Sequence, residues 1–282
     1  MTQPARRASA TKKPVPSKPS PLDRFDLYEL CAQAPARDVR MLAAIHGGSP
    51  TVLGEDFCGA AAISREWCRL IKGARAVAVD MDPEPLSRIR PTPGLRPIRS
   101  DVMRAPPSPK LDIIADLNFS VCELRERDLL VRYLRRACAR LKRNGVFVCD
   151  IYGGSDAFLT GRVREIKAGP RGERVSYTWE QRTADPLTGR VNNAMHFRVA
   201  PPTGKSAAFA PYSIHDAFVY DWRLWSVPEL RDALAEAGFD STEVYSRFAG
   251  ASDEDGNLYT QPIEDAAEVG DAFSVYVVGR KT

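Results

Sequence analysis

The stretch VLGEDFCGAA at residues 52–61 decides the fold, because an apolar strand run leads there through two acids and a glycine turn into a helix. A second apolar run, residues 76–80, ends in Asp80. In an open parallel sheet these strand ends lie side by side at the carboxyl edge. A cofactor binds there between a helix N-terminus and a carboxylate that accepts ribose hydroxyls. The sequence therefore predicts an α/β sheet with a nucleoside-cofactor site.

The turn after the first strand indicates which nucleoside binds. A dinucleotide site uses Gly-x-Gly-x-x-Gly, which lets a pyrophosphate approach the backbone and the helix N-terminus. Here Gly59 stands in a turn that also carries Glu55 and Asp56. Their carboxylates would repel a pyrophosphate and suit an ammonium, so the pattern disfavours a nicotinamide-dependent dehydrogenase.

This pattern resembles the class I S-adenosylmethionine-dependent methyltransferases, whose first motif is acid-x-Gly-x-Gly-x-Gly and whose second strand ends in a ribose-binding acid. Glu55, Gly59 and Asp80 fall on those positions, whereas Phe57 and Ala61 occupy the outer two glycine positions. The resemblance implies S-adenosyl-L-methionine as the cofactor. The two replaced glycines leave open an alternative, a cofactor-binding protein without transferase activity.

Later strands supply the rest of the cofactor site that the resemblance implies. Residues 95–102 are expected to form the third strand, with Asp101 where the family places an acid facing the adenine amino group. Residues 111–119 are expected to form the fourth strand, with Asn118 either against the cofactor's amino-acid end or capping the loop. The implied cofactor-binding residues are Glu55, Phe57, Gly59, Asp80, Met81, Asp101, Val102 and Asn118.

The remaining elements complete an α/β fold. Residues 129–141 keep a helical apolar period, which Asn144 and Gly145 would close as a left-handed cap. Further strands are expected at residues 145–151, 241–247 and 273–280. The resemblance, which covers roughly residues 24–282, implies a doubly wound, mostly parallel seven-stranded sheet of order 3-2-1-4-5-7-6 with an antiparallel final strand.

A long insertion interrupts this pattern. About 75 residues separate the fifth strand from the next helix, which begins with the capping box Ser226-x-x-Glu229. Such a connection is normally ~2–6 residues long. Apolar and polar residues alternate at 175–179, 191–199 and 218–224, which is typical of strands. We expect a three-stranded antiparallel insertion, at about residues 152–225, that caps the acceptor side.

Candidate acceptor contacts come from this insertion. Tyr220 and Trp225 would line an acceptor pocket, or else pack the core of the added strands. Glu180 or Arg223 would supply an orienting charge beside them. A dedicated base is optional, because methyl transfer from a sulfonium mainly requires alignment of the reacting atoms.

Two short helices are expected before the first strand, at residues 26–34 and 38–46, the second with Asp38 as its N-cap. They would lie over the cofactor edge as a cover. Tyr28 on the first helix would give its ring to the cofactor, or else pack on Phe25 and Leu42.

The N-terminal tail differs in composition from the rest. Residues 1–20 contain five basic residues, no acid, and repeated Pro, Ser and Ala, so we expect them to be disordered. Removing those five charges from the formal +4 leaves −1, which disfavours nucleic acid as a partner of the folded domain, residues 21–282. An RNA or protein acceptor that uses the basic tail stays an alternative.

Composition bounds the remaining possibilities. The chain of 282 residues, 44% hydrophobic, is long enough for one α/β domain. No apolar run approaches the ~18–20 residues of a membrane span. Six dispersed cysteines without a Cys-x-x-Cys pair disfavour a zinc site and indicate a reducing, cytoplasmic location. We therefore expect a cytoplasmic methyltransferase that acts on N or O of a small-molecule acceptor.

Overall fold

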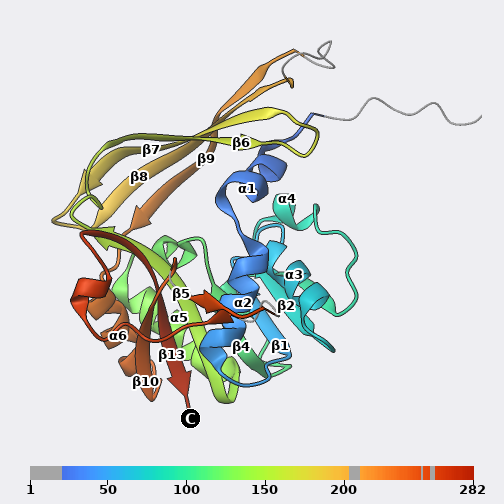
Figure 1. Cartoon of the computed structure of the whole chain (residues 1–282). Helices are drawn as coiled ribbons and strands as arrows, with labels where there is room; N and C mark the ends of the chain where they lie inside the picture. The colour runs from blue at the N-terminus through green and yellow to red at the C-terminus, as the bar shows by residue number, and fades with distance from the viewer. Residues whose placement is uncertain (1–20, 203–209, 249, 255–257) are drawn as a thin grey trace, which may run out of the picture.

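The computed structural model describes residues 21–202, 210–248, 250–254 and 258–282 (Figure 1). The basic tail at residues 1–20, predicted to be disordered, lies outside the described residues. Within those ranges, no helix combines the length and the apolar character needed to cross a membrane.

Seven strands form the central sheet, in the order β10-β13-β5-β4-β1-β2-β3 (Figure 1). β13 is antiparallel to both β5 and β10, and the other neighbours are parallel. This order confirms the fold class predicted from the sequence. The strands are β1 Val52–Asp56, β2 Arg75–Asp80, β3 Leu95–Arg99, β4 Leu111–Asp116, β5 Leu141–Gly154, β10 Ser241–Ser246 and β13 Ala272–Lys281.

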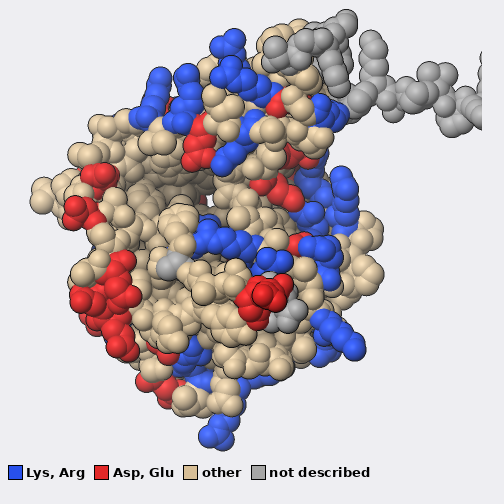
Figure 2. All heavy atoms as spheres, viewed as in Figure 1, with Lys and Arg blue, Asp and Glu red and all other residues tan. Residues whose placement is uncertain are grey.

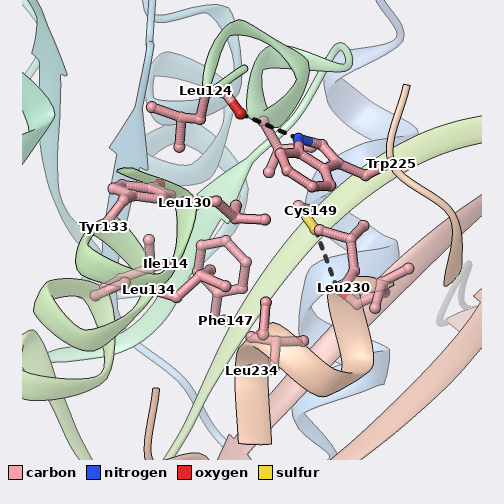
Figure 3. Packing of buried hydrophobic residues seen from close by; sticks show 14 of the residues in the cluster. Ile114, Leu124, Leu130, Tyr133, Leu134, Phe147, Cys149, Trp225, Leu230 and Leu234 are labelled. Atoms are coloured by element: carbon pink, nitrogen blue, oxygen red, sulfur yellow. Dashed lines mark hydrogen bonds between the residues drawn. The ribbon is translucent and has the colours of Figure 1, made fainter. Parts of the chain in front are cut away.

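Helices cover both faces of this sheet. The helices are α1 Arg24–Ala32, α2 Pro35–His46, α3 Ala62–Leu70, α4 Pro83–Leu86, α5 Arg127–Arg140 and α6 Val227–Glu236, with 3-10 turns η1 Val102–Arg104, η2 Ser120–Glu123 and η3 Ala266–Glu268. Alternate residues of β5 enter two different cores: Val148 packs in the one that holds Trp67 of α3. Phe147 packs with Leu134 of α5 and Leu234 of α6 (Figure 3). Because β5 is buried on both faces, a charged residue within it cannot reach solvent and requires a partner inside the protein.

Two predicted helix ends are wrong. Pro35 begins α2, because its fixed φ suits a first helical position, so Asp38 is not the N-cap and lies buried in the first turn. Asn144 does adopt a left-handed φ of 62°, but α5 ends at Arg140 and Asn144 belongs to β5. There it sits where the pairing of β5 with β4 shifts register.

The insertion forms a separate antiparallel sheet of four strands, in the order β6-β7-β8-β9 (Figure 1). Its strands are β6 Gly161–Ala168, β7 Arg174–Asp185, β8 Arg190–Ala200 and β9 Tyr212–Arg223, and a small pair is formed by β11 Ala251–Ser252 and β12 Leu258–Tyr259. The sequence prediction of three strands missed β6, because this edge strand is charged and mostly exposed. α1 packs against the sheet through Leu27, which lies in a cluster with Met195 and Phe197.

Candidate active site

The turn after β1 keeps the backbone of a glycine-rich loop with a single glycine. Phe57, Gly59 and Ala61 occupy the three glycine positions of the motif and have φ values of 55°, 53° and 54°. A left-handed conformation costs a residue with a side chain about 1–2 kcal/mol. Such strain persists where surrounding contacts enforce it, and it concentrates at functional sites.

Asp80 at the end of β2 is one of the contacts that enforce this turn. Its Oδ2 accepts a hydrogen bond of 2.8 Å from the backbone N–H of Gly59, and its Oδ1 accepts one of 2.9 Å from that of Asp82. The backbone N–H of Cys58 donates to the carbonyl of Val79 at 3.0 Å. A carboxylate offers about four acceptor positions, so half-buried Asp80 retains capacity for further donors at the sheet edge.

The two acids at the end of β1 lie inside the protein. Glu55 is 3% exposed and accepts a 2.8 Å hydrogen bond from the N–H of Ser64, and burial raises its pKa to about 7. Asp56 is 1% exposed and pairs with Arg140 at 2.6 Å. The sequence interpretation that both carboxylates face a ligand ammonium is therefore not supported. Both carboxylates instead lie buried beneath the turn and interact with partners inside the protein.

The end of β4 carries a second strained turn. Asn118 and Phe119 both have φ of 64°. Asp150 of β5, fully buried, accepts a 2.7 Å hydrogen bond from the N–H of Phe119 and pairs with Arg247 at 2.5 Å. Sequence reasoning missed Asp150 and Arg247. The signal was available, because an acid within an apolar strand requires a partner when it is buried.

A cavity of about 550 Å³ lies between this turn and the inserted sheet. Figure 2 shows the surface hollowed between the two sheets, with Lys and Arg along part of the rim. Aromatic residues from the cover helix and the insertion form much of the wall: Tyr28 of α1, Tyr177 and Trp179 of β7, and Tyr220 of β9. Asn118 and Phe119 line the same cavity. The structure thus brings together Tyr28, Tyr220 and Asn118, three residues that the sequence singled out.

Comparison with known proteins identifies the fold. No protein-family model and no curated protein matches the sequence. Among solved structures, Streptomyces venezuelae DesVI has a TM-score of 0.67 at 16% identity, covering 93% of this chain and 100% of that one. The chain has the class I S-adenosylmethionine-dependent methyltransferase fold.

Two further structures with this methyltransferase fold cover nearly the whole chain. The sugar N-methyltransferase KedS8 from a Streptoalloteichus species has a TM-score of 0.59 at 17% identity, covering 99% of this chain and 100% of that one. CalS10, an amino pentose methyltransferase from Micromonospora echinaspora solved with S-adenosylmethionine bound, has a TM-score of 0.61 at 16% identity, covering 90% and 94%.

In this methyltransferase fold, the remaining cofactor candidates lie along the ends of β2 and β3. Met81 follows Asp80, and its side chain is 69% exposed. Val102 is buried, and Asp101 caps η1 by accepting a 2.8 Å hydrogen bond from the N–H of Met103. The strand expected at residues 95–102 ends at Arg99, so Asp101 and Val102 lie in the turn that follows it, because the side chain of Asp101 begins η1 instead of extending the strand.

Glu180 is not brought to the cavity. It alternates with Trp179 along β7, so it lies on the opposite face of the inserted sheet. There it pairs with Arg162 and Arg182, and it contacts His196 at 3.0 Å. Hydrogen bonds from Arg162 lower its pKa to about 2.

Trp225 and Arg223 do not line the cavity either. Trp225 is 2% exposed, and its ring N–H donates to the carbonyl of Leu124 at 3.2 Å (Figure 3). The guanidinium of Arg223 lies 3.9 Å from the ring centroid of Trp225 and pairs with Glu229 at 3.2 Å. Through these contacts, both residues stabilise the connection between β9 and the start of α6.

Proposed function

We propose that the protein transfers a methyl group from S-adenosyl-L-methionine to N or O of a small-molecule acceptor. The observation that carries this proposal is the left-handed backbone at Phe57, Gly59 and Ala61, with the N–H of Gly59 held by Asp80. The left-handed φ at Phe57 and Ala61, which are not glycines, is strained, and such strain concentrates at functional sites. Asp80 would accept the ribose hydroxyls, and Met81 and Val102 would flank the adenine.

The cavity supports a small acceptor. Its volume of about 550 Å³ falls within the ~300–1,000 Å³ of small-molecule sites. Asn118, which the resemblance offers as a contact of the cofactor's amino-acid end, borders the cavity, so an acceptor bound there would lie beside the cofactor. The inserted sheet would act as the acceptor-side cap, excluding water and holding the nucleophile in line with carbon and sulfur.

Two proteins with the same fold support a small acceptor, because one is a sugar N-methyltransferase and the other an amino pentose methyltransferase. A cytoplasmic location is part of the proposal, because all six cysteines are free thiols, as is usual in a reducing compartment.

The experiment is a set of calorimetric titrations with S-adenosylmethionine, S-adenosylhomocysteine and NAD. We expect saturable one-site binding of the first two. NAD serves as the matched control, because it presents the same adenosine joined to a pyrophosphate. Binding of NAD alone, or of none of the three, would refute the proposal.

A further inference from the structure

A buried carboxylate in the wall of the cavity has one oxygen without a hydrogen-bond partner. Asp38 of α2 lines the cavity and is 2% exposed. Its Oδ1 accepts a 3.0 Å hydrogen bond from the hydroxyl of Tyr276. Its Oδ2 has no hydrogen-bond partner among the described residues. Buried polar atoms are nearly always paired, so an orphaned carboxylate oxygen at a cavity wall indicates a position for a ligand donor.

Arg37 and Arg247 lie near enough to lower the pKa of Asp38, but neither pairs directly with its free oxygen in the described part of the chain. Arg247, which follows β10, lines the same cavity, but its guanidinium pairs with Asp150 at 2.5 Å and lies 5.3 Å from the ring centroid of Phe119. The guanidinium of Arg37, beside Asp38 on α2, lies over the ring of Phe248. No ion pair joins either arginine to Asp38 in the described part of the chain. The charged and titratable groups facing Asp38 are thus Arg37, Arg247, Asp150 and Tyr276, and burial raises the pKa of its carboxyl.

The wall of the cavity adds aromatic faces. The rings of Trp179 and Tyr220 are stacked with centroids 6.0 Å apart, and Tyr28 lines the cavity from α1. Aromatic faces attract cations through the ring quadrupole. A carboxylate oxygen together with several aromatic rings is the combination that recognises an ammonium group. A neutral hydroxyl would donate a hydrogen bond to the carboxylate oxygen, but the aromatic rings would not attract it as they attract a cation.

We propose that Asp38 binds a protonated amine of the acceptor through Oδ2 and removes its proton before methyl transfer. This inference rests on the proposed function and selects N over O as the target. The acceptor N–H bond breaks, its proton passes to Oδ2 of Asp38, and nitrogen retains the electron pair. That pair forms the bond to the methyl carbon while the carbon–sulfur pair stays on sulfur, which becomes a neutral thioether. Asp38 later releases the proton to water.

The test compares two small probes of similar shape, benzylammonium and benzyl alcohol, on protein saturated with S-adenosylhomocysteine. Ligand-observed NMR gives the dissociation constant of each probe. The wild type should bind benzylammonium about tenfold or more tightly than the alcohol. Asp38→Asn keeps the shape but removes the charge, and should bring the ratio of the two constants close to one. Glu165→Gln is the matched control: it removes a different carboxylate that lines the cavity, one that pairs with Lys167 at 2.8 Å, and should preserve the preference.

Several results would overturn the inference. These are equal binding of the two probes by the wild type, an unchanged preference in Asp38→Asn, or loss of the preference in Glu165→Gln as well. Should Asp38→Asn fail to fold, the wild type supplies the test by titration. The preference must fall as the pH drops and Asp38 is protonated, and a preference that stays constant down to about pH 4 contradicts the inference. Failure of S-adenosylhomocysteine to bind, with the preference intact, would refute the cofactor proposal alone.

Discussion

Replacing Glu55 with Gln should change how the stability of the protein depends on pH. Glu55 is buried beneath the cofactor turn, and burial raises its pKa from 4.5 to about 7. Between those two values the folded state keeps a proton that the unfolded chain releases, so the free energy of unfolding falls as the pH rises. At about 1.4 kcal/mol for each pH unit, the interval corresponds to about 3 kcal/mol. Gln keeps an oxygen for the N–H of Ser64 and titrates no proton.

Urea denaturation of both proteins at about pH 4.5 and at about pH 8 measures this effect. The stability of Glu55→Gln relative to the wild type should increase by about 3 kcal/mol from the lower pH to the higher. Glu66→Gln is the control. Its hydrogen bond with Arg69 lowers the pKa of Glu66, so that variant should gain nothing as the pH rises. A Glu55→Gln difference that does not depend on pH would refute the assignment of a proton to this buried carboxyl.

Three further predictions concern the cofactor turn, the core and the cavity. Asp80→Ala should weaken calorimetric binding of S-adenosylhomocysteine by roughly 10–100-fold, because charge-assisted hydrogen bonds of about 1.5–3 kcal/mol are lost; unchanged affinity would remove Asp80 from the site. Trp225→Ala should lower the free energy of unfolding by about 3–5 kcal/mol, whereas Arg223→Ala, at the surface, should cost much less; equal losses would contradict the assigned burial. Tyr220→Ala should weaken benzylammonium binding, whereas Glu180→Ala, on the opposite face of the inserted sheet, should leave that binding intact. The reverse pattern would show that the acceptor does not bind in this cavity.

Local sequence patterns and the family resemblance that they carry were sufficient to predict the fold and the meeting of the ends of β1 and β2. An apolar run followed by an acid and a glycine turn specifies a strand, a turn and a helix, and parallel strands bring such ends to one edge. Asp80 and Gly59, 21 positions apart, therefore meet as expected. The turn itself was less predictable, because nothing in the chemistry of Phe57 or Ala61 indicates that each adopts a left-handed φ.

The acceptor side could be predicted only in part, because it depends on contacts between distant segments. Tyr220 reaches the cavity and Glu180 does not, and the difference depends on which face of the inserted sheet turns inward. Alternation shows that two faces exist, but only packing against α1 decides which one is buried. Asp38 was interpreted as a helix cap because its local context is that of a cap. Its cavity position arises from α2 lying against β13, more than 200 residues away in the chain.

The most direct test of the account is a crystal structure with S-adenosylhomocysteine bound. We predict ribose hydroxyls within hydrogen-bond distance of Asp80, the adenine between Met81 and Val102, and the sulfur directed toward the cavity bordered by Asn118. Phe57, Gly59 and Ala61 should keep their left-handed φ values, because the turn is already formed. Density for the ligand elsewhere, or a sulfur that points away from the cavity, would contradict the account.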